Sequence, residues 1–392
     1  MHYVNGLIFL ITLVVFLFLA FQALYLFIFS VAGRILPSKK YPESSVFGSF
    51  VIYIPSYKED SVIIETATAA LSIDYPAQQR KIVVIADSLQ PETLVRLHQL
   101  PIQVVEVSFE KSTKAKALNV ALQQTVGDYD YALVLDADNV CAKDYLYRMN
   151  DVLQTGLKVV QGRRIAKNTN TTYALLDAIS EGINNHIFRK AHRALGLSCA
   201  IIGSGMALSY SLFKAILPEI TAVGGFDKEM ELRLLRKRIK FGYAENALVY
   251  DEKTTQQSTL ANQRRRWLSA QLHYMQRYFG DGFIQLFKGN IDFFDKVMQT
   301  ILLPRIFLLG VTPVAFALSL LAGPSLSPVY WLVVWLTTYV SILLAVPAEY
   351  FNKQLFKAIY SLPAAFFTMF KLFFKLKNAN QTFIHTPHGV VK

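Results

Sequence analysis

Several patterns that common enzyme classes require are missing from this 392-residue sequence. Its first strand-like run ends in IPSYKED, which lacks the glycine-rich turn of a dinucleotide-binding fold. A GxxxxGKS or GxxxxGKT loop, which binds nucleoside triphosphates, is also absent. The chain has two cysteines, Cys141 and Cys199, and their separation fits no metal-ligand spacing. Nicotinamide-dependent enzymes, P-loop enzymes and cysteine-ligated metal proteins are therefore excluded.

Acidic and basic residues are missing from the stretch between Met1 and Ala32. This stretch contains an apolar run longer than the roughly 20 residues that span a bilayer. A cleaved signal peptide is the alternative, but the charged leader and a small-residue cleavage site are not present. We therefore predict a retained transmembrane anchor over residues 1–36.

Two further apolar segments, residues 297–323 and 329–346, lie near the C-terminus and are separated by the turn-like GPSLSP. Arg34, Lys39 and Lys40 directly follow the first segment of the chain. The positive-inside rule then places the domain of residues 37–280 in the cytosol. A cytosolic domain argues against a disulfide between the two cysteines.

The last apolar stretch, residues 358–377, carries Lys371, Lys375 and Lys377 along one side of a helix. This pattern is typical of a helix that lies in the membrane interface. Residues 281–392 are thus predicted to hold interfacial helices, two spans and a cytosolic C-terminal segment. We predict three spans in all, with four as the alternative, in a multi-pass protein of the inner cell membrane. The net charge of +12 suits anionic lipid and would equally suit an anionic substrate.

The central domain alternates between short runs rich in valine and isoleucine and helix-like sequence. The strand-like runs are residues 49–57, 81–88, 101–108 and 131–139. The segments between them have lengths that suit crossover helices. This alternation predicts an α/β fold with a mostly parallel sheet and helices on both faces.

Polar residues stand at the ends of these predicted strands, where such sheets bind their ligands. They are Pro55, Tyr57, Glu59 and Asp60 after the first strand, Asp87 and Ser88 after the second, and Asp136 and Asp138 after the fourth. If the chain stays extended at VLDADNV, the two last carboxylates point the same way. Paired carboxylates favour Mg²⁺ or Mn²⁺, particularly beside a phosphate. The alternatives are an Asx turn and a calcium loop, and Val140 stands where the calcium loop needs a ligand.

Two basic clusters are candidates for phosphate binding. Lys114 and Lys116 stand at the head of a predicted helix, where a lysine can meet a phosphate, although a solvated pair is the alternative. The segment QRRRW holds three arginines beside Trp267. It fits a pyrophosphate clamp with an indole that stacks on a sugar, or an interfacial belt. A nucleic-acid patch is unsupported, because no nucleic-acid module is present.

The stretch VGGFDKEMELRLLRKRIK offers three acids for a single catalytic carboxylate. Asp227 follows two glycines and Phe226, where a loop becomes a helix, so that it is either an N-cap or a catalytic base. Glu229 and Glu231 lie in the first turns, where acids interact favourably with the helix dipole. The residues alone leave the choice between cap and base open.

The order of IPSYKE, ADS, KAKALN, DAD, GSGMALS, GGFDKEMELRL and QRRRW resembles the membrane-integrated family-2 glycosyltransferases, which are the cellulose-, chitin- and hyaluronan-synthase-like enzymes. The resemblance covers roughly residues 50 to 280 and the flanking membrane layout. It implies a glycosyltransferase A-type domain, a nucleoside-diphosphate sugar as donor, most often a UDP-sugar, and Mg²⁺ or Mn²⁺ as cofactor.

The resemblance also implies roles for individual residues. On the donor side it assigns Pro55, Tyr57 and Glu59 to the nucleotide pocket, Asp87 to the uracil, Lys114 to the diphosphate, Asp136 to the nucleotide and Asp138 to the metal. On the acceptor side it assigns the loop of Gly203, Ser204 and Gly205, and it assigns Gln263, Arg266 and Trp267 of QxxRW to the donor diphosphate and the acceptor sugar. Asp227 becomes the general base, with Arg233 at the family spacing and Phe226 in place of the usual glutamate. The segment FIHTPH resembles a C-terminal gating segment, in which His388 stands where a lysine is common.

These features predict an inverting glycosyltransferase that extends a glycan acceptor at the cytosolic face of the membrane. A first alternative transfers one sugar to a polyprenyl phosphate or another lipid acceptor. A second is a non-catalytic membrane scaffold, which would have lost the DxD, base or QxxRW residues that this chain keeps. A transporter is disfavoured, and product export would require an oligomer or a partner.

Overall fold

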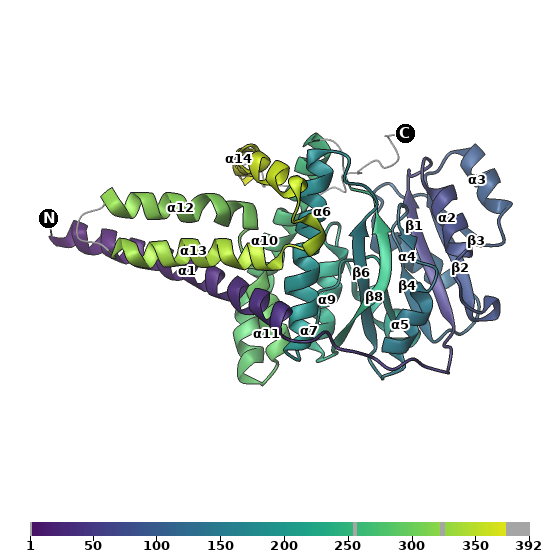
Figure 1. Cartoon of the computed structure of the whole chain (residues 1–392). Helices are drawn as coiled ribbons and strands as arrows, with labels where there is room; N and C mark the ends of the chain where they lie inside the picture. Colours follow the sequence, from purple (N-terminus) through teal and green to yellow (C-terminus); the bar gives the residue numbers. More distant parts are fainter. Residues whose placement is uncertain (1, 254–256, 322–325, 374–392) are drawn as a thin grey trace.

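The computed structural model describes residues 2–253, 257–321 and 326–373. An α/β domain forms one end of the molecule, and three long helices project together from it (Figure 1). These are α1 (His2–Ile35), α12 (Arg305–Leu321) and α13 (Pro328–Ala345). All three projecting helices are rich in apolar residues.

Within the described part of the chain, one eight-stranded sheet has the order β3-β2-β1-β4-β7-β6-β8-β5. Its strands are β1 (Phe50–Tyr57), β2 (Arg80–Asp87), β3 (Gln103–Val107), β4 (Tyr131–Val134), β5 (Val140–Cys141), β6 (Val159–Ala166), β7 (Met206–Ser209) and β8 (Phe241–Asp251). The strand β1 pairs in parallel with β2 and β4, and β7 and β5 join antiparallel to their neighbours. The predicted α/β fold with a mostly parallel sheet is confirmed.

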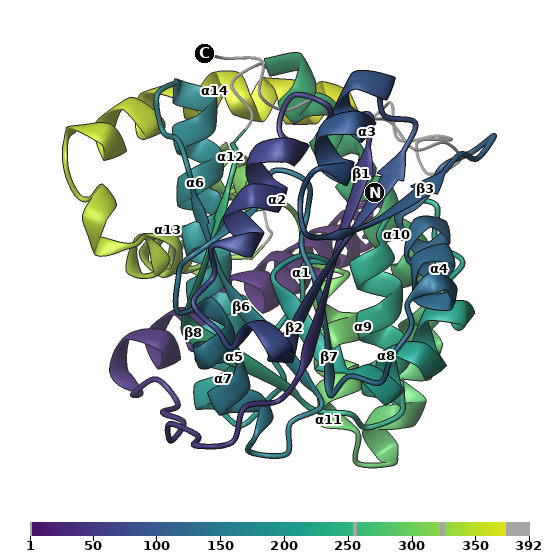
Figure 2. The same ribbon diagram turned by 90° about the vertical axis from the view of Figure 1, so that its right-hand side faces the viewer.

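Helices cover both faces of the sheet (Figure 2). One face carries α2 (Ile63–Leu71) and α5 (Tyr145–Leu153), and the other carries α4 (Lys114–Gln124), α8 (Tyr210–Ile216) and α9 (Phe226–Arg236). Val51 belongs to one core and the next residue, Ile52, to the other, because successive strand residues point to opposite faces. Both residues are fully buried, which explains why the strands are continuously apolar rather than alternating.

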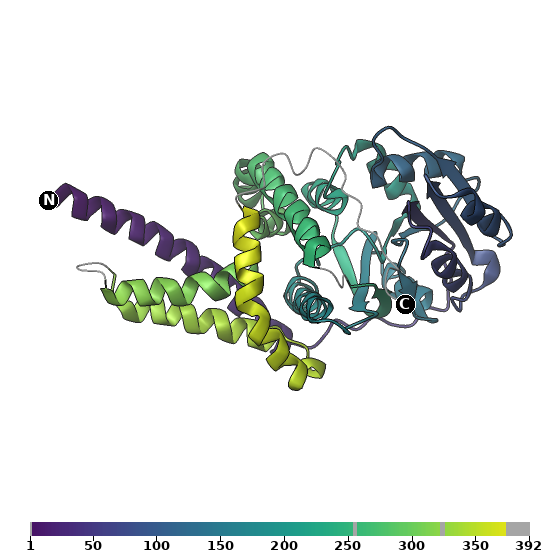
Figure 3. The same ribbon diagram turned by 90° about the horizontal axis from the view of Figure 1, so that it is seen from above.

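The helix α3 (Pro91–His98) lies at the edge of the sheet that is far from the three projecting helices (Figure 1). The remaining helices build the side of the domain that faces the projecting helices. They are α6 (Thr172–Asn184), which continues as a π-helix over Asn185–Ala191, α7 (His192–Ala194), α10 (Gln257–Phe287), α11 (Ile291–Gln299) and α14 (Lys353–Phe373). Seen from above, α14 crosses the direction of the three projecting helices (Figure 3).

Two helices are long and apolar enough to cross a membrane, over Asn5–Ile35 and Pro328–Ala345. The helix α12 is apolar as well but is shorter, at 17 residues. The predicted segment over residues 297–323 is therefore divided, because α11 ends at Gln299 and α12 begins at Arg305.

Polar contacts fix α1 to the rest of the molecule. Arg34 donates hydrogen bonds to the carbonyl oxygens of Leu344 (2.5 Å) and Val346 (2.6 Å) at the end of α13, where carbonyl groups lack helical partners. The hydroxyl of Tyr25 donates to Asp295 of α11 (2.8 Å), and a carboxylate oxygen of Asp295 lies 3.2 Å from the His192 Nε2 atom. These contacts set the direction of α1 relative to the domain.

Candidate active site

One cavity of about 870 Å³ connects the carboxyl ends of the strands with the apolar helices. Twelve of the fourteen residues predicted from the sequence line it, and these are Pro55, Tyr57, Glu59, Asp87, Lys114, Asp136, Asp138, Gly203, Asp227, Gln263, Arg266 and Trp267. Its other end is lined by residues of α12, α13 and α14. A single space therefore joins a polar site to an apolar passage.

The predicted nucleotide wall stands at the paired ends of β1 and β2. Tyr57 pairs with Asp87 in the register of these strands. The residue directly after each strand has a positive φ, which is 55° for Lys58 and 59° for Ser88. Left-handed backbone is costly for residues with a Cβ atom and recurs at functional sites. Burial raises the pKa of the Asp87 carboxyl above its ordinary value, while the Ser88 hydroxyl donates to it (3.0 Å).

Lys114 is the first residue of α4 and reaches across the cavity. Its Nζ donates to a carboxylate oxygen of Asp136 and to the carbonyl oxygen of Gly203 (2.7 Å). It also lies 5.9 Å from the centre of the Phe226 ring, which occupies the position of the expected glutamate. The lysine thus has a carboxylate on one side and an aromatic face on another.

The DxD segment turns instead of staying extended. The amide of Asn139 donates to the carbonyl oxygen of Asp136 (3.1 Å), so the chain forms a turn here, and the condition of an extended chain is not met. The two carboxylates still line the same cavity. Asp138 is nearly fully buried, and its carboxylate accepts hydrogen bonds from the side chain of Asn139 (3.2 Å) and the amide of Glu252 (3.0 Å).

Ser204 and Gly205 lie behind the cavity wall. The Ser204 hydroxyl accepts a hydrogen bond from the amide of Asp136 (2.8 Å) and donates to the side chain of Asn139. The carbonyl of Gly205 accepts from the Gln161 side chain (2.9 Å). These two residues therefore support the DxD turn, and only Gly203 of this loop reaches the cavity.

Asp227 is the second residue of α9, and Gly225, with a φ of 76°, is the cap residue. Of the two alternatives that the sequence left open for Asp227, the N-cap does not apply, because the cap position falls two residues earlier. The carboxyl lines the cavity, and burial raises its pKa above the ordinary value. A carboxylate with a raised pKa is a stronger proton acceptor, as a general base requires.

The two glutamates that follow, Glu229 and Glu231, are buried acids of α9. Glu229 is 1% exposed and accepts from Arg233 (2.7 Å) and from the amide of Thr221 (3.1 Å). Glu231 is fully buried, accepts from the amide of Ile201 (3.0 Å) and pairs with Lys296 of α11 (2.8 Å). They hold α9 against its neighbours, and Arg233 acts on Glu229 rather than on Asp227.

The QRRRW segment lies in the first half of α10. Among the residues that the structure describes, the buried Gln263 Oε1 atom has no hydrogen-bond partner, which makes it an acceptor available to a ligand hydroxyl. Burial lowers the pKa of the Arg266 guanidinium. Trp267 is 42% exposed, and the Arg264 guanidinium lies 4.8 Å from its ring centre. The indole therefore keeps a face open to the cavity.

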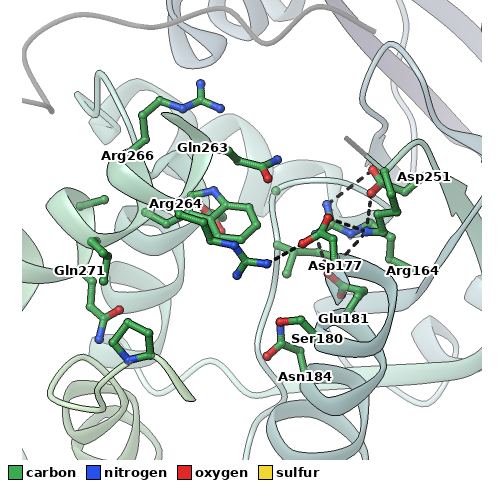
Figure 4. Close-up of a pocket in the computed structure, with 18 of the residues that line it drawn as sticks. Arg164, Asp177, Ser180, Glu181, Asn184, Asp251, Gln263, Arg264, Arg266 and Gln271 are labelled. Atoms are coloured by element: carbon green, nitrogen blue, oxygen red, sulfur yellow. Dashed lines mark hydrogen bonds and ion pairs between the residues drawn. The ribbon is translucent and has the colours of Figure 1, made fainter. Parts of the chain in front are cut away.

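A buried ion network that the sequence did not reveal stands beside this helix (Figure 4). Arg264 reaches from α10 to Asp177 of α6 (2.6 Å), while Glu181 pairs with Arg164 (2.8 Å) and with Arg189 in the π-helix (2.9 Å). The sequence gave one indication of this network, because Asp177 and Glu181 stand four residues apart in a helix that is otherwise uncharged.

The ion network extends to the predicted metal ligand. The nearly fully buried Lys253 forms an ion pair with Asp251 (2.7 Å). Although burial opposes ionisation, Arg164 and Lys253 hold the pKa of Asp251 below its ordinary value. The side chain of Asn139 donates to both Asp251 (3.1 Å) and Asp138 (3.2 Å). The network thus sets the position of the Asp138 carboxylate.

The donor set suits a divalent cation that also binds phosphate. Asp136 and Asp138 supply carboxylate oxygens, which Mg²⁺ and Mn²⁺ prefer. The described residues contain no group of three or more histidine, cysteine, aspartate or glutamate side chains arranged to hold a metal ion. Mg²⁺ at nucleotide sites is typically held by one or two carboxylates and completed by phosphate oxygens and water. The FIHTPH segment with His388 lies outside the described residues.

A mostly parallel sheet with acidic residues at its strand ends and a carboxylate across the cavity defines a glycosyltransferase of the A-type fold. A mannosyltransferase from Pyrobaculum calidifontis, solved in complex with GDP-mannose and Mn²⁺, has a similar structure, with a TM-score of 0.57 and 16% sequence identity. That similarity covers 85% of this chain and 96% of the mannosyltransferase, and it supports the fold.

Residues 48–270 match the model of the family described as glycosyltransferase-like family 2. That match spans more than half of the chain, which therefore belongs to glycosyltransferase family 2. The chain accordingly carries a glycosyltransferase domain.

Two curated relatives are similar to parts of the chain. The β-monoglucosyldiacylglycerol synthase of Synechocystis is 24% identical over 299 residues, which are 72% of this chain and 60% of that protein. Cellulose synthase 1 of Komagataeibacter xylinus is 28% identical over 96 residues, which are 24% of this chain and 6% of that protein. The chain thus spans less than two thirds of either relative.

Proposed function

We propose that this enzyme transfers one sugar from a nucleoside-diphosphate sugar to a lipid-borne acceptor at the cytosolic face of the inner membrane, with inversion. The observation that carries the proposal is the continuity of the cavity. Asp138, Asp227 and Trp267 line the same space as Leu309 of α12 and Ile342 of α13. An acceptor whose tail stays among apolar helices can thus bring its head group to the carboxylates.

The proposed multi-pass topology rests on α1, α12 and α13, which project together from the domain (Figure 1). Two of them have the length and composition of a membrane span. The third, α12, is apolar but shorter than the other two. We assign it to the membrane because it packs against both α13 and α14. The helix α14, which crosses them, would then lie along the interface.

The donor is assigned to the polar end of the cavity. Tyr57 and Asp87 would hold the base, and Lys114 and Arg266 would hold the diphosphate. Lys114 would exchange its contact with Asp136 for a phosphate oxygen, since lysine and arginine both bind phosphate through charge-assisted hydrogen bonds. A UDP-sugar is the first candidate. The GDP-mannose of the similar mannosyltransferase makes a GDP-sugar the second.

The chemistry is a single in-line displacement at the anomeric carbon. An acceptor hydroxyl oxygen forms the new bond to this carbon as the bond to the diphosphate oxygen breaks. The hydroxyl proton moves to the Asp227 carboxylate, and the electron pair leaves with the nucleoside diphosphate. Asp138 and Asp136 would hold Mg²⁺ or Mn²⁺, which supplies positive charge against the leaving diphosphate. Because this leaving group is good, no second carboxylic acid is required.

A growing glycan is the second candidate acceptor, and one observation favours it. The exposed face of Trp267, with Arg264 beside its ring, forms a platform on which a sugar ring can stack. The similarity to cellulose synthase over 96 residues agrees with this alternative. Product export by an oligomer or partner would then be required.

The proposal is tested with the full-length protein in detergent micelles. Radiolabelled UDP- and GDP-sugars are incubated with Mg²⁺ or Mn²⁺ and with extracted lipids, and the label is measured in the lipid, polymer and water fractions. We expect label in the lipid fraction, one sugar per lipid. Label found only in polymer would overturn the lipid acceptor in favour of the glycan.

The metal assignment has its own test in the same assay. Asp138→Asn should abolish transfer with little change in melting temperature, because asparagine keeps an oxygen for the amide of Glu252. The matched control is Asp144→Asn, which removes a carboxylate that pairs with Arg148 at the surface. Chelation should stop the native enzyme, and added Mn²⁺ should restore it. Full turnover by Asp138→Asn would contradict the assignment.

A further inference from the structure

Arg305 lines the cavity where its wall changes from charged to apolar. It is the first residue of α12, and the next cavity-lining residues of that helix, Ile306, Leu308 and Leu309, are apolar. On the other side stand Ser180 and Asn184 of α6, which belong to the same cavity wall. The guanidinium therefore lies at the boundary between the sugar-transfer site and the passage assigned to the lipid.

The hydrogen bonds of Arg305 all go to neutral groups. One Nη donates to the side-chain oxygen of Asn184 (2.8 Å), and the other donates to the carbonyl oxygen and the hydroxyl of Ser180 (3.1 and 2.9 Å). Within the described residues Arg305 forms no ion pair. Three of its five N–H groups are thus used, and two remain for a ligand.

Nearby carboxylates are already neutralised by other cations. Asp177 is held by Arg264 (2.6 Å), and Lys253 lies 3.9 Å from it. Glu181 and Asp251 are paired with Arg164, Arg189 and Lys253. With Arg305, the described cluster contains five cations and, counting Asp138, which it reaches through Asn139, four carboxylates, so one positive charge is in excess. Unpaired charge in a poorly solvated wall is costly, and an anion at this place would relieve that cost.

The segment that carries Arg305 is held in place from α10. The side-chain amide of Gln271 donates to the carbonyl oxygens of Thr300 (3.0 Å) and Leu302 (2.6 Å), in the connection between α11 and α12. Gln271 and Ser180 face the same part of the cavity from different helices, whereas Arg266 points to another side of α10 (Figure 4). Arg305 and Arg266, the arginine assigned to the donor diphosphate, thus belong to different parts of the cavity wall.

We propose that Arg305 binds a phosphate group of the acceptor lipid. This inference rests on the proposed function, since it specifies which lipids the enzyme uses. A planar guanidinium suits phosphate oxygens, and the positive end of the α12 dipole lies at the same level. The lipid tail would lie along α12, α13 and α14, and its hydroxyl-bearing head would extend toward Asp227. The phosphate could belong to a phosphoglycerolipid or to a polyprenyl-linked sugar, and both share this chemistry.

The experiment compares acceptors that differ in phosphate. Pure dodecyl maltoside micelles carry dioleoylglycerol or a glucosyldiacylglycerol as phosphate-free lipids, and phosphatidylglycerol or an undecaprenyl-diphosphate sugar as phosphate lipids. The readout is the ratio of kcat/KM for a phosphate lipid to kcat/KM for a phosphate-free one. We expect this ratio to exceed one for the native enzyme and to identify which of the two phosphate sources is used.

Three variants make the test specific. Arg305→Gln should lower the ratio roughly tenfold to a hundredfold, as expected for the loss of charged hydrogen bonds. Asn184→Asp, which nearly preserves shape and places a carboxylate on Arg305, should lower it in the same direction. Lys288→Gln removes an equal charge from the exposed turn between α10 and α11 and should keep the ratio, which controls for general attraction to anionic micelles.

The outcomes separate the two proposals. A ratio below one that Arg305→Gln and Asn184→Asp leave unchanged overturns the phosphate site but leaves lipid transfer standing. No transfer to any of the four lipids, with transfer to a soluble glycan, overturns the proposed function itself. If Arg305→Gln does not fold, Asn184→Asp decides the matter, because it adds an ion pair instead of leaving a buried cavity.

Discussion

Gly203 lies directly against the Asp227 side chain. A Cβ atom built on Gly203 would stand 3.3 Å from the Asp227 Cβ. The glycine also has a φ of 75°, a backbone conformation that side-chain-bearing residues rarely adopt. Its carbonyl oxygen accepts from Lys114 (2.7 Å), so one glycine touches both the proposed base and the proposed diphosphate ligand.

Gly203→Ala is therefore expected to lower activity far more than its size suggests. The added methyl would press on Asp227, and the positive φ would cost roughly 1–2 kcal/mol of stability. We expect kcat to fall at least tenfold with a small decrease in melting temperature. Gly156→Ala is the control, because Gly156 also has a positive φ but has open space around its Cβ position. Equal losses of kcat in both variants would contradict the contact argument.

The pH dependence of the reaction should report on Asp227. Burial raises the pKa of this carboxyl, and the base acts only when it is deprotonated. Activity should therefore fall as the pH is lowered through this raised pKa, which lies above the ordinary aspartate value. The measurement is kcat/KM against pH at saturating metal, and Asp227→Asn should abolish transfer at every pH.

As the pH is lowered, the contribution of Asp227 to folding stability should rise, whereas the activity should fall. The folded protein holds the Asp227 proton more tightly than the unfolded chain does, so the buried charge destabilises the protein above the raised pKa and this cost disappears as the pH falls. Asp227→Asn should accordingly leave the melting temperature at pH 7 unchanged or raise it. A clear decrease would show that the carboxylate is held by structural bonds rather than kept ready for catalysis.

The sequence was sufficient for the strands and for most of the cavity wall, because both follow from local patterns. Apolar runs such as residues 50–54 can only be buried, and the polar residues that follow parallel strands meet at one edge of the sheet. The same reasoning brought Asp87 and Asp138 to one cavity from separate strands.

Long-range pairing explains what the sequence could not supply. The sequence placed Glu231 near the helix dipole but gave no sign of its ion pair with Lys296 of α11, which lies 65 residues later in the chain. The resemblance assigned Ser204 to the acceptor loop, whereas in the structure its hydroxyl accepts a hydrogen bond from the amide of Asp136. Neither contact has a periodic signal, since each depends on how distant elements pack.

The ion pair between Arg264 and Asp177 should be important for stability as well as for position. Asp177 is largely buried, so removal of its partner leaves a poorly solvated carboxylate. Arg264→Gln is expected to cost on the order of 3 kcal/mol, although the remaining contact of Asp177 with Lys253 reduces the loss. Thermal unfolding in detergent measures the change.

A double-mutant cycle distinguishes the pair from separate effects of its members. Asp177→Asn in the Arg264→Gln background removes the unpaired carboxylate and should recover part of the lost stability. Purely additive losses in the double variant would mean that the two side chains do not interact in solution.

The last prediction concerns Trp267, whose exposed face lies in the cavity beside Arg264. If the indole supports the acceptor, Trp267→Ala should raise the acceptor KM several-fold, since stacking on an aromatic face contributes about 1 kcal/mol. Hydrolysis of the nucleotide sugar without acceptor should fall much less, because water needs no platform. Trp267→Phe should restore part of the acceptor binding. Parallel losses of transfer and hydrolysis in the alanine variant would instead place the indole at the donor, which would move the boundary between the two subsites along α10.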